Sequence, residues 1–115
     1  MNTRRKGREG EEKAVEFLKK QGYGILSRNF ASRHGEIDIV ARKGKEIVFV
    51  EVKMRSSTVF GYPAEAVTCR KAERLRRTAM YYLVKNRIED AACRFEVVSV
   101  MKTGPDYAID IIPME

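Results

Sequence analysis

Three charged residues inside two strongly apolar segments are the side chains of this sequence best placed to do chemistry. Asp38 lies within the run Ile-Asp-Ile-Val at residues 37–40, and Glu51 and Lys53 follow the run Ile-Val-Phe-Val at residues 47–50. Alternate residues of a strand share a face, so Glu51 and Lys53 point the same way. Runs that are apolar at nearly every position are typical of strands covered on both faces. A charge inside such a strand needs a partner or an ion, because burying it alone is expensive.

The spacing of the two segments predicts a hairpin that brings their acids together. A two-residue turn at Lys43-Gly44 sets Asp38 opposite Phe49. Glu51 then shares the face of Asp38 at diagonal reach, ~7–8 Å between backbones, and Glu36 falls on that face too. A slip of one residue would move one strand's whole set to the other face, so the convergence depends on this register.

An amphipathic segment near the start supplies a further acid. Apolar residues recur at helical spacing from about residue 8 to residue 21, and Glu11 precedes Ala14 by three residues and Leu18 by seven. That spacing places Glu11 on the apolar face of the helix. Two or three carboxylates at the edge of a core repel each other, and a divalent cation would relieve the repulsion, as Lys53 would in part.

Two simpler interpretations of these charges stay open at this point. Glu51 and Lys53 could form a same-face ion pair, and Glu11 could be an acid favoured by the helix dipole. A zinc site is not expected, because the chain has one histidine and two widely separated cysteines, Cys69 and Cys93. A site built from carboxylates favours hard cations, Mg²⁺ or Mn²⁺.

The rest of the chain predicts the elements that must position these residues. Strand-like runs cover about residues 23–30, 36–42, 46–54, 94–101 and 107–112, and a second helix follows Pro63, is capped by Thr68 and ends near residue 86. The order of helix, three strands, helix and two strands predicts an α/β fold with a central sheet flanked by helices. The 115 residues suffice for a single domain, residues 1–115. No apolar run could span a bilayer and no secretory signal is visible, so we expect a cytoplasmic protein with reduced thiols.

Five motifs together resemble a known family. They are Gly7-Arg8-Glu9-Gly10-Glu11, Gly35-Glu36-Ile37-Asp38-Ile39-Val40, Val48-Phe49-Val50-Glu51-Val52-Lys53-Met54-Arg55, Phe60-Gly61, and Val67-Thr68 with Lys71. The sequence resembles the YraN family, small bacterial proteins within the PD-(D/E)XK nuclease superfamily, whose fold is similar to that of archaeal Holliday-junction resolvases. Met54 stands where the family usually has Thr, outside the inferred metal ligands.

The resemblance implies a fold, an activity and a set of roles. The fold would be a restriction-endonuclease-like core with a mixed sheet, and the activity would be hydrolysis of phosphodiester bonds in DNA, branched DNA included, with Mg²⁺ or Mn²⁺. Asp38 and Glu51 would be metal ligands, with the Val52 carbonyl as a third. Lys53 would orient the attacking water, and Glu11 would act on the metal directly or through water. Glu36 would support these residues, and the likeness to resolvases makes a homodimer plausible.

Basic residues suggest a polyanionic partner. Lys and Arg number 23 against 16 Asp and Glu, for a net charge of +7. We predict that Arg70, Arg74 and Arg77 form an exposed stripe on the second helix that contacts DNA, together with Arg55 and with Lys71, which turns toward the sheet. A merely solvated charged face is the plainer interpretation, and a membrane partner is not expected. The remaining alternative to an enzyme is an inactive nuclease-fold module that binds nucleic acid or a protein.

Overall fold

The helices and strands follow one another along the chain in the predicted order: one helix, three strands, a second helix and two strands. The structure of the protein is a computed structural model, which describes residues 3–55 and 69–114. Helix α1 spans Thr3–Lys20 and helix α2 spans Cys69–Lys85; the strands are β1 (Gly24–Ser32), β2 (Gly35–Lys43), β3 (Glu46–Arg55), β4 (Cys93–Thr103) and β5 (Asp106–Met114). The predicted cap Thr68 and the preceding Pro63 lie outside the described residues. Neither of the helices described here is long and apolar enough to cross a membrane.

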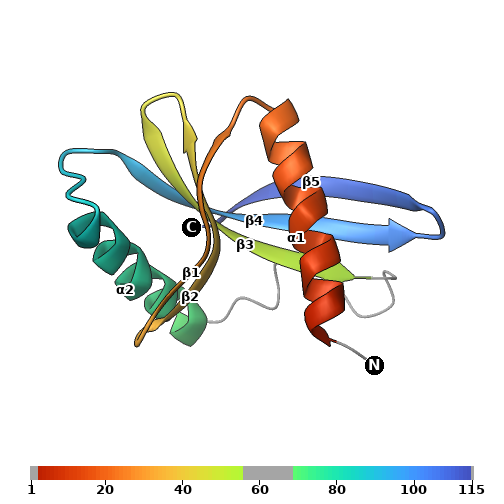
Figure 1. The fold of residues 1–115 in the computed structure, drawn as a ribbon, viewed down its shortest axis with the longest axis horizontal. Coiled ribbons are helices and arrows are strands. Elements are labelled where there is room, and N and C mark those ends of the chain that lie inside the picture. The colour runs from red at the N-terminus through yellow and green to blue at the C-terminus, as the bar shows by residue number, and fades with distance from the viewer. Residues whose placement is uncertain (1–2, 56–68, 115) are drawn as a thin grey trace.

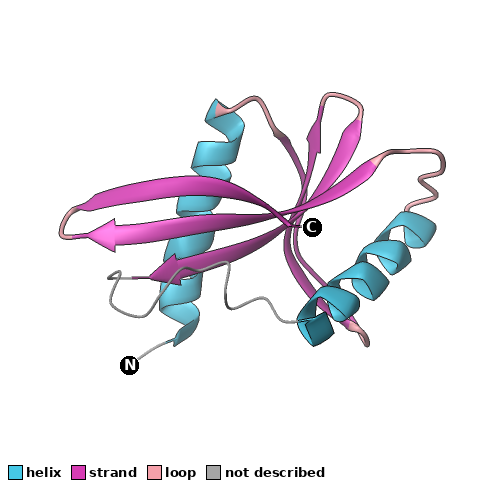
Figure 2. Ribbon diagram, turned by 180° about the vertical axis from the view of Figure 1, so that it is seen from behind, coloured by secondary structure: helices cyan, strands magenta, loops and turns pink. Residues whose placement is uncertain are grey.

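The five strands form one mixed sheet in the order β1-β2-β3-β4-β5. All neighbours are antiparallel except β3 and β4, which are parallel and joined through α2. Helix α1 lies on the face of the sheet nearer the viewer in Figure 1, and α2 lies on the opposite face, which Figure 2 brings to the front. The predicted α/β architecture, a central sheet flanked by helices on both faces, is therefore confirmed.

Apolar side chains fill the space on both faces of the sheet. On the α1 side, Leu18 packs with residues such as Ile39 and Val50, and on the α2 side Phe49 packs with Leu75 among others. Residues 39–41 and 47–50 are all buried, as predicted from their continuous apolar character. Burying each large apolar side chain contributes roughly 1.5–3 kcal/mol, so the segments that carry Asp38 and Glu51 are anchored in the core on both faces of the sheet.

The turn between β2 and β3 differs from the predicted one. Lys43 pairs with Glu46, so the two-residue loop is Gly44-Lys45 and not Lys43-Gly44. Gly44 has φ +61°, the left-handed backbone that a type II′ turn needs at its first central residue and that glycine adopts without strain. The observed register differs from the predicted one by two residues. Because this number is even, Asp38 and Glu51 still lie on the same face of the sheet, although the predicted pairing of Asp38 with Phe49 is wrong.

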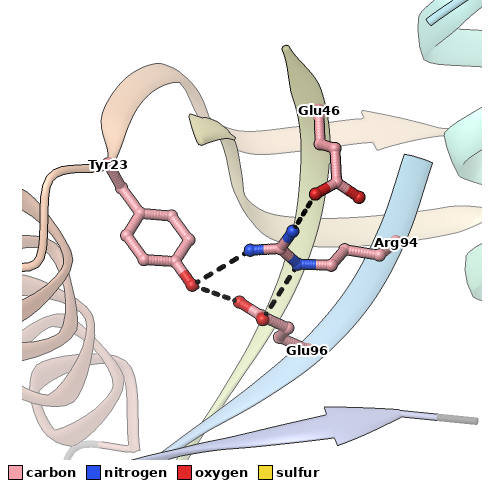
Figure 3. Close-up of polar contacts among 4 residues, drawn as sticks. All are labelled: Tyr23, Glu46, Arg94 and Glu96. Atoms are coloured by element: carbon pink, nitrogen blue, oxygen red, sulfur yellow. Dashed lines mark hydrogen bonds and ion pairs between the residues drawn. The ribbon is translucent and has the colours of Figure 1, made fainter. Parts of the chain in front are cut away.

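A cluster of hydrogen-bonded polar side chains lies at the end of the sheet where β3 and β4 begin (Figure 3). The hydroxyl of Tyr23 donates to Glu96 Oε1 at 2.9 Å, Arg94 Nε donates to Glu96 Oε2 at 3.1 Å, and Arg94 also bonds Glu46. Burial raises the pKa of Tyr23, whereas the hydrogen bond with Tyr23 and then those with the two glutamates raise the pKa of Arg94. The cluster ties the α1–β1 connection to β3 and β4 and holds the buried Glu96 as part of a satisfied network.

Candidate metal and nucleic-acid site

The candidate site lies where β2 parts from β3. Pairing between these strands ends at Ile39 and Val50; beyond it β2 continues with β1 alone and β3 with β4 alone. Figure 1 shows β1 and β2 turning away from β3 at this point. Asp38 is the first residue past the split, and its Oδ2 accepts a hydrogen bond from the Val52 N–H at 2.8 Å. The side chain thus takes the place of the missing strand partner.

The carboxyl groups of Asp38 and Glu51 meet at this split. Continuing the observed register sets the two residues opposite each other, and their side chains share a hydrogen bond. Burial first, and then the bond and negative charge of Glu51, raise the pKa of Asp38 to about 8. Burial acts to raise the pKa of Glu51 as well, but the bonds with Asp38 and Lys71 outweigh it and lower that pKa. The two carboxyl groups therefore titrate as a coupled pair in which Asp38 is the weaker acid.

Two lysines approach the carboxyl pair from different elements. Lys71, on α2, places its Nζ 2.9 Å from Glu51 Oε2, and it turns toward the sheet as its helical position predicts. Lys53 follows Glu51 on the same face of β3. Burial and the adjacent Lys71 ammonium lower the pKa of Lys53. Burial acts to lower the pKa of Lys71 too, but its bonds with Lys53 and Glu51 raise it.

Glu11 is buried, as predicted, but its partners come from β1. Arg28 Nε and Asn29 Nδ2 both donate to Glu11 Oε1, at 2.9 and 3.0 Å. The negative charge of Glu11 is among the influences that raise the pKa of Asp38, which places Glu11 at the margin of the pair. Gly10 allows α1 to pack closely against β3, because a Cβ at this position would lie 2.9 Å from the Met54 Cβ.

Arg28 and Asn29 were not predicted as site residues. Asn29 has φ +54°, unusual for a residue other than glycine and tolerated best by Asn and Asp. An Asn inside a strand-like run was the available signal, because strands are depleted in Asn. The hydrogen bond that the Asn29 side chain donates to Glu11 explains why Asn stands at this position of the strand.

The other predicted site residues divide into two groups. Arg70, Arg74 and Arg77 are exposed on α2 as the stripe predicts. Arg55 follows Lys53 on the same face of β3, and among the described residues its buried Nε has no hydrogen-bond partner. Glu36 is not gathered with the others: it is exposed, pairs with Ala31 of β1, and lies in the part of β2 that has left β3.

The donor set suits a hard divalent cation that keeps most of its water. Within the described residues no group of three His, Cys, Asp or Glu side chains is close enough to hold a metal. The available donors are the two carboxylates and the Val52 carbonyl, which points to the same side of the strand as the N–H bonded to Asp38. Magnesium is commonly held by one or two carboxylates with water completing its shell. The two carboxyl groups that meet at the split in the sheet fit that description.

Fold and strand order together define an α/β protein with a restriction-endonuclease-like core. The model of one protein family, described as "Uncharacterised protein family UPF0102", matches residues 10–100. The chain belongs to this family, also called the YraN family, which confirms the resemblance found in the sequence.

Relatives match over nearly their full length. A UPF0102 protein of Caldicellulosiruptor saccharolyticus is 50% identical over 111 residues, 96% of this chain and 94% of the relative. One from Acetivibrio thermocellus is 51% identical over 116 residues, 98% of this chain and 89% of the relative. A third, from Moorella thermoacetica, is 52% identical over 100 residues, 87% of this chain and 83% of the relative.

Proposed function

We propose that this protein is a divalent-metal-dependent endonuclease that hydrolyses phosphodiester bonds in DNA. The observation that carries the proposal is the meeting of the Asp38 and Glu51 carboxyl groups at a split in the sheet, with Lys53 on the same face of β3. Two carboxyl groups held together in a partly buried place repel each other when both are ionised, which disfavours folding at neutral pH. A divalent cation would relieve that repulsion fully, as Lys71 does in part through its ion pair with Glu51.

Each side chain has a role in such a site. Asp38 and Glu51 would hold Mg²⁺ or Mn²⁺, with the Val52 carbonyl as the third protein ligand. When bound, the cation supplies charge neutralisation for the transition state and lowers the pKa of an attacking water. Lys53 orients that water and stabilises the negative charge that develops on its oxygen. Glu11, whose carboxylate accepts hydrogen bonds from Arg28 and Asn29, would act on the cation directly or through water.

The basic side chains fit a DNA substrate. Arg70, Arg74 and Arg77 are exposed along one stripe of α2, and the buried Nε of Arg55 is a donor that a phosphate oxygen could satisfy. Branched DNA cut by a cytoplasmic homodimer, with one site for each strand, is the form of substrate and assembly that the likeness to resolvases suggests. Sedimentation of the protein with and without a four-way junction tests the dimer.

The test combines metal binding with cleavage. Calorimetric titration of Mn²⁺ into wild type should give binding that Glu51→Gln and Asp38→Asn abolish and that Glu16→Gln, a matched change at an exposed acid of α1, leaves unchanged. A panel of duplex, single-stranded and four-way-junction DNA should then be cleaved by wild type and Glu16→Gln alone. DNA binding and Mn²⁺ binding without cleavage of any form would identify the inactive module instead. Absence of Mn²⁺ binding would refute the metal site.

A further inference from the structure

The outer side of α2 carries a patch of exposed apolar side chains. Among the described residues four large hydrophobic side chains are exposed, and three of them lie close together on this helix: Met80 (63% exposed), Tyr81 (45%) and Val84 (71%). Residues three and four apart are neighbours on a helix surface, so Val84 adjoins both of the others. Single exposed hydrophobic residues are ordinary, whereas a cluster of them is a feature of binding surfaces. These three residues are called the Met80 patch below.

The Met80 patch is not needed to fill the core. The opposite side of the same helix supplies the buried residues Leu75, Ala79 and Tyr82, which pack on the sheet. Tyr81 rests at the margin of this layer, with its ring centroid 6.0 Å from that of Phe30 on β1. Figure 2 shows α2 in front of the sheet, where it packs against β1 and β2. The patch is thus presented on a helix that is fixed from behind, which lowers the cost of ordering it when a partner binds.

Basic residues border the Met80 patch along the helix. Arg76 and Arg77 lie in the turn before it and Lys85 directly follows it, and all three are exposed. Glu73 is the only acid of α2. Its ion pairs with Arg76 and Arg77, at 3.6 and 3.5 Å, join exposed side chains and are therefore weak. This border of positive charge favours a partner that carries acids next to apolar side chains.

We propose that the Met80 patch docks an acidic amphipathic helix of a partner protein. Met80 and Val84 are four residues apart, a spacing at which one helix presents a seam to another. Apolar residues three and four apart on the partner would pack against this seam and the Tyr81 ring, the pattern by which amphipathic helices are recognised. Its acidic residues would pair with Arg76, Arg77 and Lys85. The inference goes beyond the proposed nuclease activity and does not depend on it.

Charge and size distinguish this partner from other occupants. A symmetric contact with a second copy would bring the same cations together, and each copy has a net charge of +7. Three side chains are also few for a stable protein dimer, which buries about 800 Å² on each partner. DNA would find cations on this helix, but Met80 and Val84 offer neither a donor for a phosphate nor a ring for stacking a base. An acidic amphipathic helix uses both the patch and its border.

Fluorescence anisotropy with two designed peptides tests the docking on the full chain. One labelled peptide of about four helical turns carries Leu on its apolar face and Glu at most other positions, and the second has Lys in place of each Glu. We expect a micromolar Kd for the acidic peptide and binding weaker by about tenfold or more for the basic one. Met80→Ser combined with Val84→Ser should raise the Kd of the acidic peptide about tenfold, because two apolar contacts are lost. Arg76→Glu combined with Lys85→Glu should raise it by a similar factor.

A matched control separates the patch from exposed apolar surface in general. Leu26, on β1, is the fourth large hydrophobic residue exposed among the described ones, at 43%, and Leu26→Ser should leave the Kd unchanged. Urea unfolding of each variant checks that the fold is kept. The charge-reversal variant leaves every apolar side chain in place, so it tests the docking even if the serine variant is destabilised.

Several results would overturn the inference. Absence of binding, or equal binding of the two peptides, would remove the acidic partner. Binding that the serine variant leaves unchanged would place the peptide elsewhere on the surface. Sedimentation equilibrium, flotation with phosphatidylglycerol-containing vesicles and titration of an oligo-dT strand cover the other occupants. Self-association, vesicle binding or oligonucleotide binding that is lost in the serine variant and kept in Leu26→Ser would assign the patch to a second copy, a membrane or DNA instead.

Discussion

Replacing Asp38 by Asn should stabilise the metal-free protein at neutral pH, although the residue lies at the edge of the core. The pKa of Asp38 is raised from 3.8 to about 8 by burial and by Glu51. In the unfolded chain the same carboxyl ionises near 3.8, so folding at pH 7 requires that it take up a proton. Asn keeps an oxygen for the Val52 N–H and an amide that can donate to Glu51, and it needs no proton.

The magnitude and sign follow from the two pKa values of Asp38. Because its folded pKa lies above its unfolded pKa, the stability it contributes is fully present below pH ~4 and is lost as the pH rises toward 8. At pH 7 the loss spans about 3 pH units, each worth roughly 1.4 kcal/mol, which sets a ceiling of about 4 kcal/mol. The variant should gain up to this amount over wild type at pH 7 and almost nothing at pH 4.

Urea unfolding in EDTA across this pH range measures the effect. The informative quantity is the difference in unfolding free energy between wild type and variant at each pH, because any packing change in the variant contributes equally at acid and at neutral pH. Asp110→Asn, at an exposed position on β5, is the matched control and should show no such trend. If Asp38→Asn and wild type keep a constant difference from acid to neutral pH, Asp38 is not a protonated buried acid and the argument for the pair fails.

Three further outcomes are expected. If wild type cleaves DNA, Lys53→Met should lower turnover while leaving equilibrium DNA binding nearly unchanged, because its role is confined to the transition state; single-turnover cleavage and a filter-binding assay measure the two. Arg74→Ala combined with Arg77→Ala should weaken binding to all sequences alike and reduce the slope of log K against log salt by about 2 in titrations at several ionic strengths. Tyr23→Phe should destabilise the fold by about 1–2 kcal/mol in urea, whereas Tyr81→Phe, at a half-exposed ring, should be nearly neutral, since only Tyr23 donates to a buried carboxylate.

Much of the fold could be predicted because its signals are local and repeated. Apolar periodicity, turn residues and the continuous hydrophobic character of β2 and β3 predict each element and its order. The predicted β2–β3 register was wrong. Gly44 can be the first or the second residue of an acceptable two-residue turn, and the sequence alone does not choose between these two turns. Because the register was wrong by an even number of residues, Asp38 and Glu51 were still predicted on the same face of the sheet.

The site was harder to predict because its contacts join distant elements. The burial of Glu11 follows from helical spacing, but its bonds to Arg28 and Asn29 require the path of β1, which local pattern does not specify. Glu36 was expected near the acids because a straight strand would carry it there; β2 instead leaves β3 just before that point. The bending of a strand depends on how the whole sheet twists and packs, so it cannot be predicted from the residues of that strand alone.

The two ends of β3 show how differently this fold treats buried charge. At the start of the strand, Arg94 lies between Glu46 and Glu96 and the hydroxyl of Tyr23 completes the cluster, so a buried carboxylate has its donors (Figure 3). At the far end, the carboxyl groups of Asp38 and Glu51 meet, Lys71 pairs with Glu51, and a buried arginine nitrogen has no partner among the described residues. The same sheet can evidently satisfy such groups when stability alone is at stake. The gathering of two acids, a lysine and a buried arginine nitrogen at this end of the strand supports the proposed site for a cation and a phosphate.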